Sequence, residues 1–142
     1  MSEENCIFCK IVRGEMPSSI IFEDDTCMAF MDVFPVSDGH SLLIPKKHYV
    51  NMFDVDPDVV AHLAKRLADL TKSVKKVTGE EGVINIVANG EGAGQEVPHL
   101  HFHTIPRGRK SPFGFKFPPN YRDTMADREN LDQMAKRIRE SI

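Results

Sequence analysis

The stretch that most constrains the fold of this chain is residues 94–106, with the sequence GQEVPHLHFHTIP. Its three histidines, His99, His101 and His103, alternate with apolar residues. Successive side chains of a β-strand point to opposite faces, so as a strand this stretch has an imidazole face and an apolar face. A helix would scatter the three rings around its circumference. The pattern therefore predicts a strand whose apolar side fills a core while the histidines line a cleft.

Three imidazoles on one face allow three interpretations: a metal site, a site for an extended anion, or histidines without a function whose ring nitrogens are hydrogen-bonded on an exposed strand. The outer rings, His99 and His103, would lie roughly 13 Å apart at about 3.3 Å per residue. One zinc ion, with Zn–N bonds of about 2.0–2.1 Å, cannot easily reach both. A metalloenzyme site built from all three histidines is therefore rejected, and an extended anionic substrate fits the row better.

The loop before the histidines, residues 89–95 (NGEGAGQ), contains three glycines. Glycine allows unusual backbone angles and close approach to a ligand, and consecutive backbone N–H groups can bind phosphate oxygens. A plain hairpin loop between two strands also explains the glycines. Beside the row of histidines, the loop favours an anion such as a phosphate ester.

The stretch GQEVPHLHFHTIPR resembles the signature of the histidine-triad (HIT) nucleotide hydrolases and transferases. Two earlier stretches, IFCKIVRGEMPSSIIFEDDTCMAFMDV and GHSLLIPKKHY, are similar to segments of the Hint-like branch of that family, in the same order. The resemblance runs from about Cys6 to Arg107. It departs at Thr104, where the family usually has an aliphatic residue, but threonine is β-branched and suits a strand.

The chain of 142 residues has the length of one domain. We expect an α+β, HIT-like fold: an antiparallel sheet of about five strands with one long covering helix, a short N-terminal helix and a C-terminal helix. Residues 1–110 form the expected HIT domain, and residues 111–142 an extension packed on that domain or on a dimer partner. The expected helices span residues 6–13, 57–78 and 123–142, and the expected strands before the histidines span residues 20–23, 27–32, 39–45 and 82–88.

Cys6 and Cys9 form a CxxC pair at the start of the expected N-terminal helix. Two thiols at this spacing can bind zinc if two further ligands exist, and His48 and His99 are candidates. Zinc-bearing members of the resembled branch have ligands at these four positions, which implies a closed structural Cys2His2 site. The alternative is a reduced, metal-free pair. Cys27 lies among apolar residues and is expected in the core.

The resemblance also implies roles at the nucleotide. His101 would be the nucleophile, and His103 would bind phosphate or leaving-group oxygens. His40 would support the catalytic ring, through its orientation or its charge. Asp32 would accept the ribose hydroxyls, although a solvated strand-end acid is the plainer interpretation. The other expected nucleotide-binding residues are Ile7, Phe8, Ile11, Asn89, Gly94, Gln95 and Val97. Ile7, Phe8 and Ile11 would form an apolar wall against the base or simply pack the N-terminal helix on the domain. No catalytic divalent metal is required.

These features predict a hydrolase of purine nucleoside phosphoramidates or dinucleoside polyphosphates, which acts at the α-phosphate through a covalent nucleotidyl-histidine. The alternative is a non-catalytic nucleotide-binding interaction module that holds AMP or GMP. Glu96 stands where some phosphoramidase relatives have serine, which leaves the preferred leaving group open.

Composition and charge set the expected surroundings. No run approaches the roughly 20 apolar residues of a membrane span, and the acidic N-terminus lacks a signal peptide's layout, so a cytoplasmic location is expected. A formal net charge of -3 without a basic stripe argues against a general nucleic-acid binder.

Family members pair as dimers whose sheets join, which implies a homodimer. His62 lies off the apolar row of the long helix and is expected in solvent, without a role.

Overall fold

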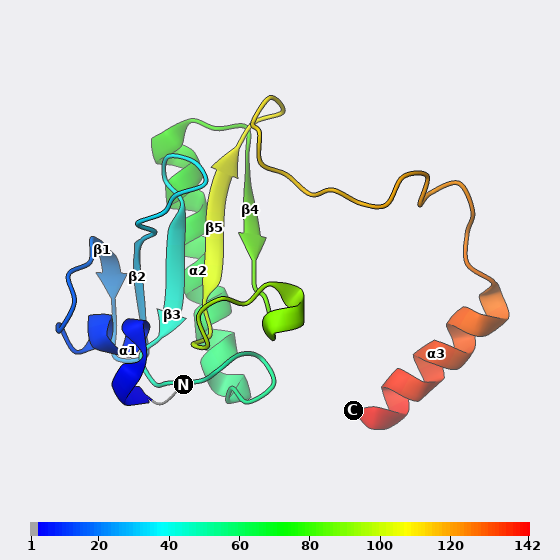
Figure 1. Cartoon of the computed structure of the whole chain (residues 1–142), viewed down its shortest axis with the longest axis horizontal. Coiled ribbons are helices and arrows are strands. Elements are labelled where there is room, and N and C mark those ends of the chain that lie inside the picture. The colour runs from blue at the N-terminus through cyan, green and yellow to red at the C-terminus, as the bar shows by residue number, and fades with distance from the viewer. Residues whose placement is uncertain (1–2) are drawn as a thin grey trace.

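The computed structural model describes residues 3–142, and its centre is one five-stranded antiparallel sheet with the strand order β1-β2-β3-β5-β4 (Figure 1). Between and around the strands lie a short helix, a long helix and a C-terminal helix, as expected for the α+β class. No helix of the described residues is long and apolar enough to cross a membrane. The elements are β1 (Ile20–Glu23), β2 (Cys27–Met31), β3 (Ser41–Pro45), β4 (Gly82–Ile86), β5 (Phe102–Arg107), α1 (Ile7–Val12), α2 (Pro57–Thr78), α3 (Arg128–Ser141) and the 3-10 turns η1 (Glu3–Asn5) and η2 (Glu91–Ala93).

Local sequence explains where the long helix α2 begins and ends. The Asp56 carboxylate caps it by accepting a hydrogen bond from the Asp58 N–H at 2.8 Å, and Pro57 occupies the first turn. Gly79 ends it in a left-handed conformation with φ 69°, and its N–H donates to the Lys75 carbonyl oxygen at 2.9 Å. The predicted bounds of this helix are confirmed.

The sheet separates two apolar cores because neighbouring residues on its inner strands face opposite sides. Leu43 and the predicted core residue Cys27 are fully buried in the cluster beneath α2. Leu42 and Phe30 lie instead in a cluster that includes residues of α1. The same alternation governs the histidine segment, since Leu100 belongs to the first cluster.

The histidine strand is shorter than predicted. β5 begins only at Phe102, so His99 and His101 precede it. Pro98 cannot donate a strand hydrogen bond, and the Leu100 N–H donates to the Tyr49 carbonyl oxygen at 2.7 Å outside the sheet. The predicted division between an imidazole face and an apolar face nevertheless holds.

Two polar residues are placed by partners distant in sequence. Thr104 is fully buried on β5, and its hydroxyl accepts a hydrogen bond from Asn85 Nδ2 of β4 at 3.1 Å. His62 is not a free solvent-facing residue as predicted, because its Nε2 lies 2.8 Å from Asp24 Oδ2 in the β1–β2 turn. This contact joins α2 to the hairpin.

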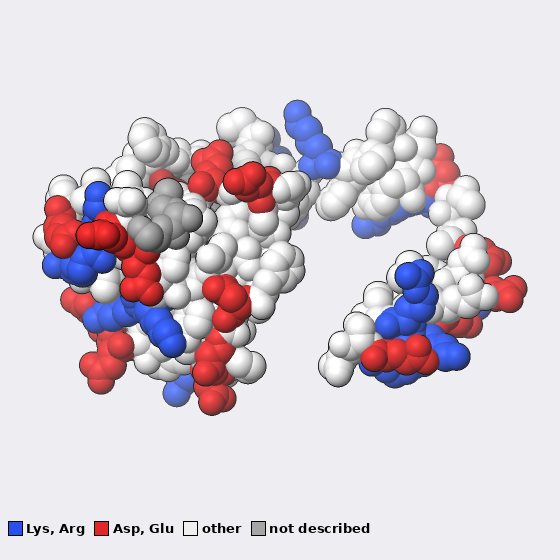
Figure 2. Space-filling model, turned by 60° about the horizontal axis from the view of Figure 1, so that its bottom comes forward, with Lys and Arg blue, Asp and Glu red and all other residues white. Residues whose placement is uncertain are grey.

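The C-terminal part of the chain leaves the domain after β5. Residues 114–142 are all exposed, and Figures 1 and 2 show α3 set apart from the domain. Helix α3 begins at Arg128, later than predicted, because the Asp127 carboxylate caps it through the Asn130 N–H. Packing of this extension on the domain or on a dimer partner stays a prediction.

Candidate functional site

Four potential metal ligands meet where α1 approaches the end of β3. Cys6 caps α1, Cys9 lies within it, His48 follows β3, and His99 precedes β5. Their ligand atoms all lie within 4.8 Å of one another. Cys6 Sγ lies 3.3 Å from His99 Nδ1, and Cys9 Sγ lies 3.3 Å from His48 Nδ1. The structure therefore brings together the four residues predicted to bind zinc.

The donor set fits a tetrahedral zinc ion. Bonds of about 2.3 Å to sulfur and about 2.0–2.1 Å to nitrogen place neighbouring sulfur and nitrogen ligands roughly 3.5 Å apart. His99 Nε2–H donates to the Pro45 carbonyl oxygen at 2.9 Å, which leaves the lone pair of Nδ1 facing the cysteines. Burial raises the pKa of the Cys9 thiol to about 12, so a thiolate here requires a bound cation.

Beside this cluster lies a cavity of about 430 Å³, between α1, the segment after β2, and the residues around β5. Its only charged lining residues other than histidines are Asp32 and Glu96, and no described Lys or Arg lines it. Among the predicted catalytic and nucleotide-binding residues, those that line it are Ile7, Phe8, Ile11, Asp32, His40, Gly94, Val97, His101 and His103.

Hydrogen bonds fix which nitrogen of each neutral cavity ring carries the proton. The Val36 N–H donates to His40 Nδ1 at 3.0 Å, so the His40 proton lies on Nε2. This group donates to His103 Nδ1 at 2.9 Å, which leaves the His103 proton on Nε2. His101 Nδ1–H donates to the His99 carbonyl oxygen at 2.7 Å. His103 thus offers a donor and His101 an unprotonated Nε2, with ring centroids 4.9 Å apart.

Burial keeps these rings neutral near pH 7. Burial first, and then the neighbouring rings of His101 and His40, lower the pKa of His103 to about 4. Burial also lowers the pKa of His101, against the opposing effects of its hydrogen bond to His99 and of the two cavity carboxylates. A neutral imidazole can act as a nucleophile, whereas an imidazolium cannot.

Asp32 lies directly after β2, on the wall of the cavity. Its Oδ1 accepts a hydrogen bond from the Phe34 N–H at 2.9 Å, and its Oδ2 lies 3.4 Å from His40 Nε2. The side chain is 17% exposed, so the carboxylate stays accessible from the cavity. It is therefore more than a solvated acid at the end of a strand.

Two predicted nucleotide-binding residues do not line the cavity. Gln95 is buried, and its amide oxygen accepts from the Gly90 N–H while its amide nitrogen donates to the Val50 carbonyl oxygen at 2.6 Å. Asn89 accepts a hydrogen bond from the Met52 N–H at 2.8 Å. Both side chains hold the glycine loop in place, and a direct nucleotide contact by either stays a prediction.

Sequence reasoning missed part of the cavity wall. Most of these residues lie within the stretches that resemble the family, but no pattern singles them out as lining residues, because they come from three different segments. They are Pro17, Ser18, Phe30, Met31, Val33, Phe34, Val36 and Leu42.

Comparison with known proteins gives a consistent result. The HIT domain model matches residues 13–110. Adenylylsulfatase HINT3 of Arabidopsis thaliana is 42% identical over 105 residues, which cover 74% of this chain and 53% of that protein, so the chain spans about half the length of this relative. Adenosine 5'-monophosphoramidase hnt1 of Schizosaccharomyces pombe is 40% identical over 72% of this chain and 74% of its own length.

Solved structures agree with this match. SMU.412c from Streptococcus mutans superposes with a TM-score of 0.91 at 35% identity, covering 99% of this chain and 87% of its own. A Zn-bound histidine triad family protein from Mycobacterium smegmatis superposes with a TM-score of 0.75 at 30% identity, covering 93% of this chain and 91% of its own. On the match of sequence, fold and histidine geometry, the chain belongs to the HIT domain family.

Proposed function

We propose that this protein hydrolyses purine nucleoside phosphoramidates at the α-phosphate, with His101 as the nucleophile. The observation that carries the proposal is the pair of fixed tautomers in one cavity. His101 has an unprotonated Nε2, and His103 beside it has a protonated one. The relatives named as an adenylylsulfatase and a phosphoramidase support nucleotide hydrolysis in general.

The proposed reaction has two steps. The His101 Nε2 lone pair attacks phosphorus, the P–N bond breaks, and the nitrogen, which has taken a proton from solvent beforehand, leaves with that electron pair as a neutral amine, while His103 Nε2–H donates a hydrogen bond to a phosphate oxygen. Water then attacks the nucleotidyl-histidine, the bond from phosphorus to His101 Nε2 breaks, AMP or GMP is released, and the proton lost by the water passes to solvent. Gly94 and Val97 line the same cavity and would bind the phosphate oxygens through their backbone N–H groups.

Charge on the cavity wall supports an amine as the leaving group. A dinucleoside polyphosphate would expel a chain with several negative charges, and such a chain needs cationic partners. The cavity instead has two carboxylates, Asp32 and Glu96, and no lysine or arginine among its lining residues. An amine leaves neutral or positively charged, so Glu96 attracts it or leaves it undisturbed.

We further propose that zinc bound by Cys6, Cys9, His48 and His99 has a structural role. Three of the four ligands are buried, which leaves no open coordination position for a substrate. When bound, the ion supplies a cross-link between α1 and the segments around β3 and β5. The pairing of chains as a homodimer and a cytoplasmic location stay predictions.

A comparison of turnover with binding tests the proposal. His101→Ala is expected to lose at least 10³-fold in the hydrolysis of adenosine phosphoramidate, as measured by release of ammonia, while calorimetry still shows AMP binding. His62→Ala is the matched control, because His62 lies outside the cavity. Turnover of His101→Ala at the control's rate would exclude His101 as the nucleophile. A wild-type protein that binds AMP without turning over this substrate or a dinucleoside tetraphosphate would be the binding module instead.

A further inference from the structure

Asn51 is a buried polar residue that lines neither the cavity nor the proposed zinc site. It lies in the segment between β3 and α2, and only 6% of it is exposed. Both ends of its side-chain amide are hydrogen-bonded. Asn51 Oδ1 accepts from the Phe53 N–H at 2.9 Å, and Nδ2 donates to Gln95 Oε1 at 3.1 Å. Asn51 therefore joins its own segment to the glycine loop, residues 89–95.

Backbone groups fix the direction in which both amides face. The Phe53 N–H can only donate, so the side-chain oxygen of Asn51 faces it and the NH2 group of Asn51 faces Gln95. The Gly90 N–H can also only donate, and Gln95 Oε1 accepts from it at 2.8 Å. Reversal of either amide would place two donors or two acceptors against each other. Each amide therefore has one orientation in the folded chain.

The Gln95 side chain binds the glycine loop at its beginning and just beyond its end. Its oxygen accepts from Gly90, and its nitrogen donates to the carbonyl oxygens of Val97 at 3.1 Å and Val50 at 2.6 Å. With the bond from Asn51, Gln95 makes all four hydrogen bonds that an amide side chain can make. The path of the loop thus depends on one buried side chain, and Asn51 supplies one of its four bonds.

The two residues that follow Gln95, Glu96 and Val97, line the cavity. In the described part of the chain, neither of their backbone N–H groups takes part in a hydrogen bond. Free N–H groups at a cavity wall can donate to phosphate oxygens as negative charge grows there in a transition state. Such donors are effective only about 2.7–3.1 Å from the charged oxygen. A small displacement of the loop would therefore weaken them.

We propose that Asn51 is a positioning residue for the proposed hydrolysis. It touches no reacting atom, but it fixes the Gln95 amide and so holds the N–H groups of Glu96 and Val97 in place at the cavity wall. The inference rests on the proposed function, because the place of these groups affects a rate only if phosphorus reacts in this cavity.

Steady-state kinetics provide the first test. Asn51→Ala is expected to lower kcat for adenosine phosphoramidate about 10-fold and to raise KM less than threefold, because the N–H groups bind most strongly in the transition state. Asn51→Asp keeps the size of the side chain but places a second acceptor against Gln95 Oε1, and it should lower kcat at least as much. Asn51→Ser, whose hydroxyl is too short to reach Gln95, repeats the test if Asn51→Ala fails to fold.

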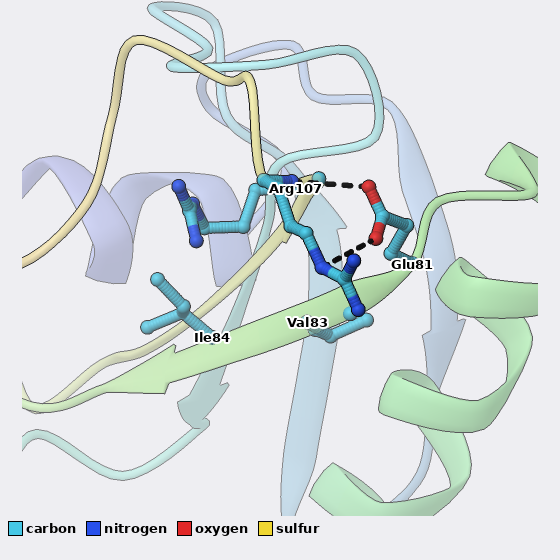
Figure 3. Close-up of a pocket in the computed structure, with 7 residues that line it drawn as sticks. Glu81, Val83, Ile84 and Arg107 are labelled. Carbon is cyan, nitrogen blue, oxygen red and sulfur yellow. Dashed lines mark hydrogen bonds and ion pairs between the residues drawn. The ribbon is translucent and has the colours of Figure 1, made fainter.

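The matched control removes a contact between two segments away from the cavity. Just before β4, the Glu81 carboxylate accepts a hydrogen bond from the Arg109 N–H at 3.1 Å and lies 3.4 Å from Arg109 Nε (Figure 3). Neither residue lines the cavity. Glu81→Ala should therefore change kcat less than twofold. An equal loss of kcat in Glu81→Ala and Asn51→Ala would show general destabilisation and overturn the proposal.

A double-mutant cycle tests whether Asn51 acts through Gln95. Gln95→Met keeps the volume of the side chain and removes its amide. If Asn51 acts only on that amide, addition of Asn51→Ala to Gln95→Met should change kcat less than twofold, whereas independent effects would multiply. Losses that multiply would overturn the proposal.

Hydrogen exchange measured by NMR without nucleotide provides a test that needs no turnover. Exchange of the Gly90 N–H should be at least 10-fold faster in Asn51→Ala than in the wild type, and within twofold of the wild type in Glu81→Ala. Unchanged exchange in Asn51→Ala, or faster exchange with an unchanged kcat, would overturn the proposal. A wrong proposed function is recognised separately, because then the wild type itself does not turn over the substrate or His101→Ala keeps its rate.

Discussion

Replacement of Asp24 by asparagine should destabilise the protein in a manner that depends on pH. The Asp24 carboxylate accepts hydrogen bonds from the Thr26 and Cys27 N–H groups at 2.8 Å and lies 2.8 Å from His62 Nε2. Burial alone would raise its pKa, but these hydrogen bonds outweigh burial and lower the pKa of Asp24 below its ordinary value of 3.8. The carboxylate therefore stabilises the folded chain in its charged form.

The size of the effect follows from the contacts that asparagine keeps. Its side-chain oxygen can still accept from the two backbone N–H groups, but the charge-assisted contact with His62 and the ion pair with Arg66 Nε at 3.5 Å are lost. A hydrogen bond to a charged group contributes about 1.5–3 kcal/mol, which is the expected loss for Asp24→Asn at pH 7. His62→Gln is the matched variant, because it changes the same contact from α2 and leaves both turn hydrogen bonds intact.

The sign of the pH dependence is fixed by the lowered pKa. A carboxyl whose pKa is lower in the folded chain than in the unfolded chain stabilises the fold above the unfolded value, and this contribution disappears as the pH falls below it. The free energy of unfolding of the wild type should exceed that of Asp24→Asn by about 1 kcal/mol less at pH 3 than at pH 5. Urea unfolding of both proteins at pH 7, 5 and 3 measures the difference, and other acid-sensitive groups cancel in it. A difference that is absent at pH 7, or that grows as the pH falls, would refute the reasoning.

Three further outcomes concern the histidine sites. His40→Ala should lower kcat about 10-fold with little change in KM, because His103 loses the hydrogen-bond donor that fixes its tautomer. His40→Gln can still donate a hydrogen bond and should recover part of the rate. The wild-type rate should be constant from pH 8 to about pH 6 and fall as the pH approaches 4, because the pKa of His103 is about 4 and its protonated Nδ1 can no longer accept from His40; a midpoint at pH 6.5 or above would contradict this. Removal of zinc by a chelator, or Cys9→Ser, should lower the melting temperature by at least 5 °C, whereas Cys27→Ser, a buried cysteine outside the cluster, should leave the measured zinc content unchanged.

The sequence predicts best those features that short stretches determine by themselves. Asp56, Pro57 and Gly79 specify both ends of α2 through contacts within a few residues. The alternation around Leu100 likewise assigns sides to the histidine segment before any partner is known. Because both patterns depend on local backbone geometry, they survive even where β5 turns out shorter than the pattern suggests.

Features that depend on distant partners escape a reading of the sequence. His62 looks free on its helix, but the fold brings Asp24 of the hairpin to it. Gln95 is the second residue of the recognisable motif, yet its side-chain amide is bonded to the buried Asn51 amide and the Val50 carbonyl oxygen. The cavity wall is similar, since its apolar residues come from separate segments that only the folded sheet brings together.

The spacing of the three histidines explains how one short segment can serve two sites. A row roughly 13 Å long is too extended for one ion, and the fold divides it: His99 joins the cysteines, while His103 joins His40. His101 lies between them and is bound to the first site through the carbonyl oxygen of His99. A metal ion that holds the His99 ring therefore also fixes the backbone group that orients the neighbouring ring. The proposed zinc ligand His99 and the proposed nucleophile His101 are thus separated by a single residue of main chain, although no substrate needs to touch the metal.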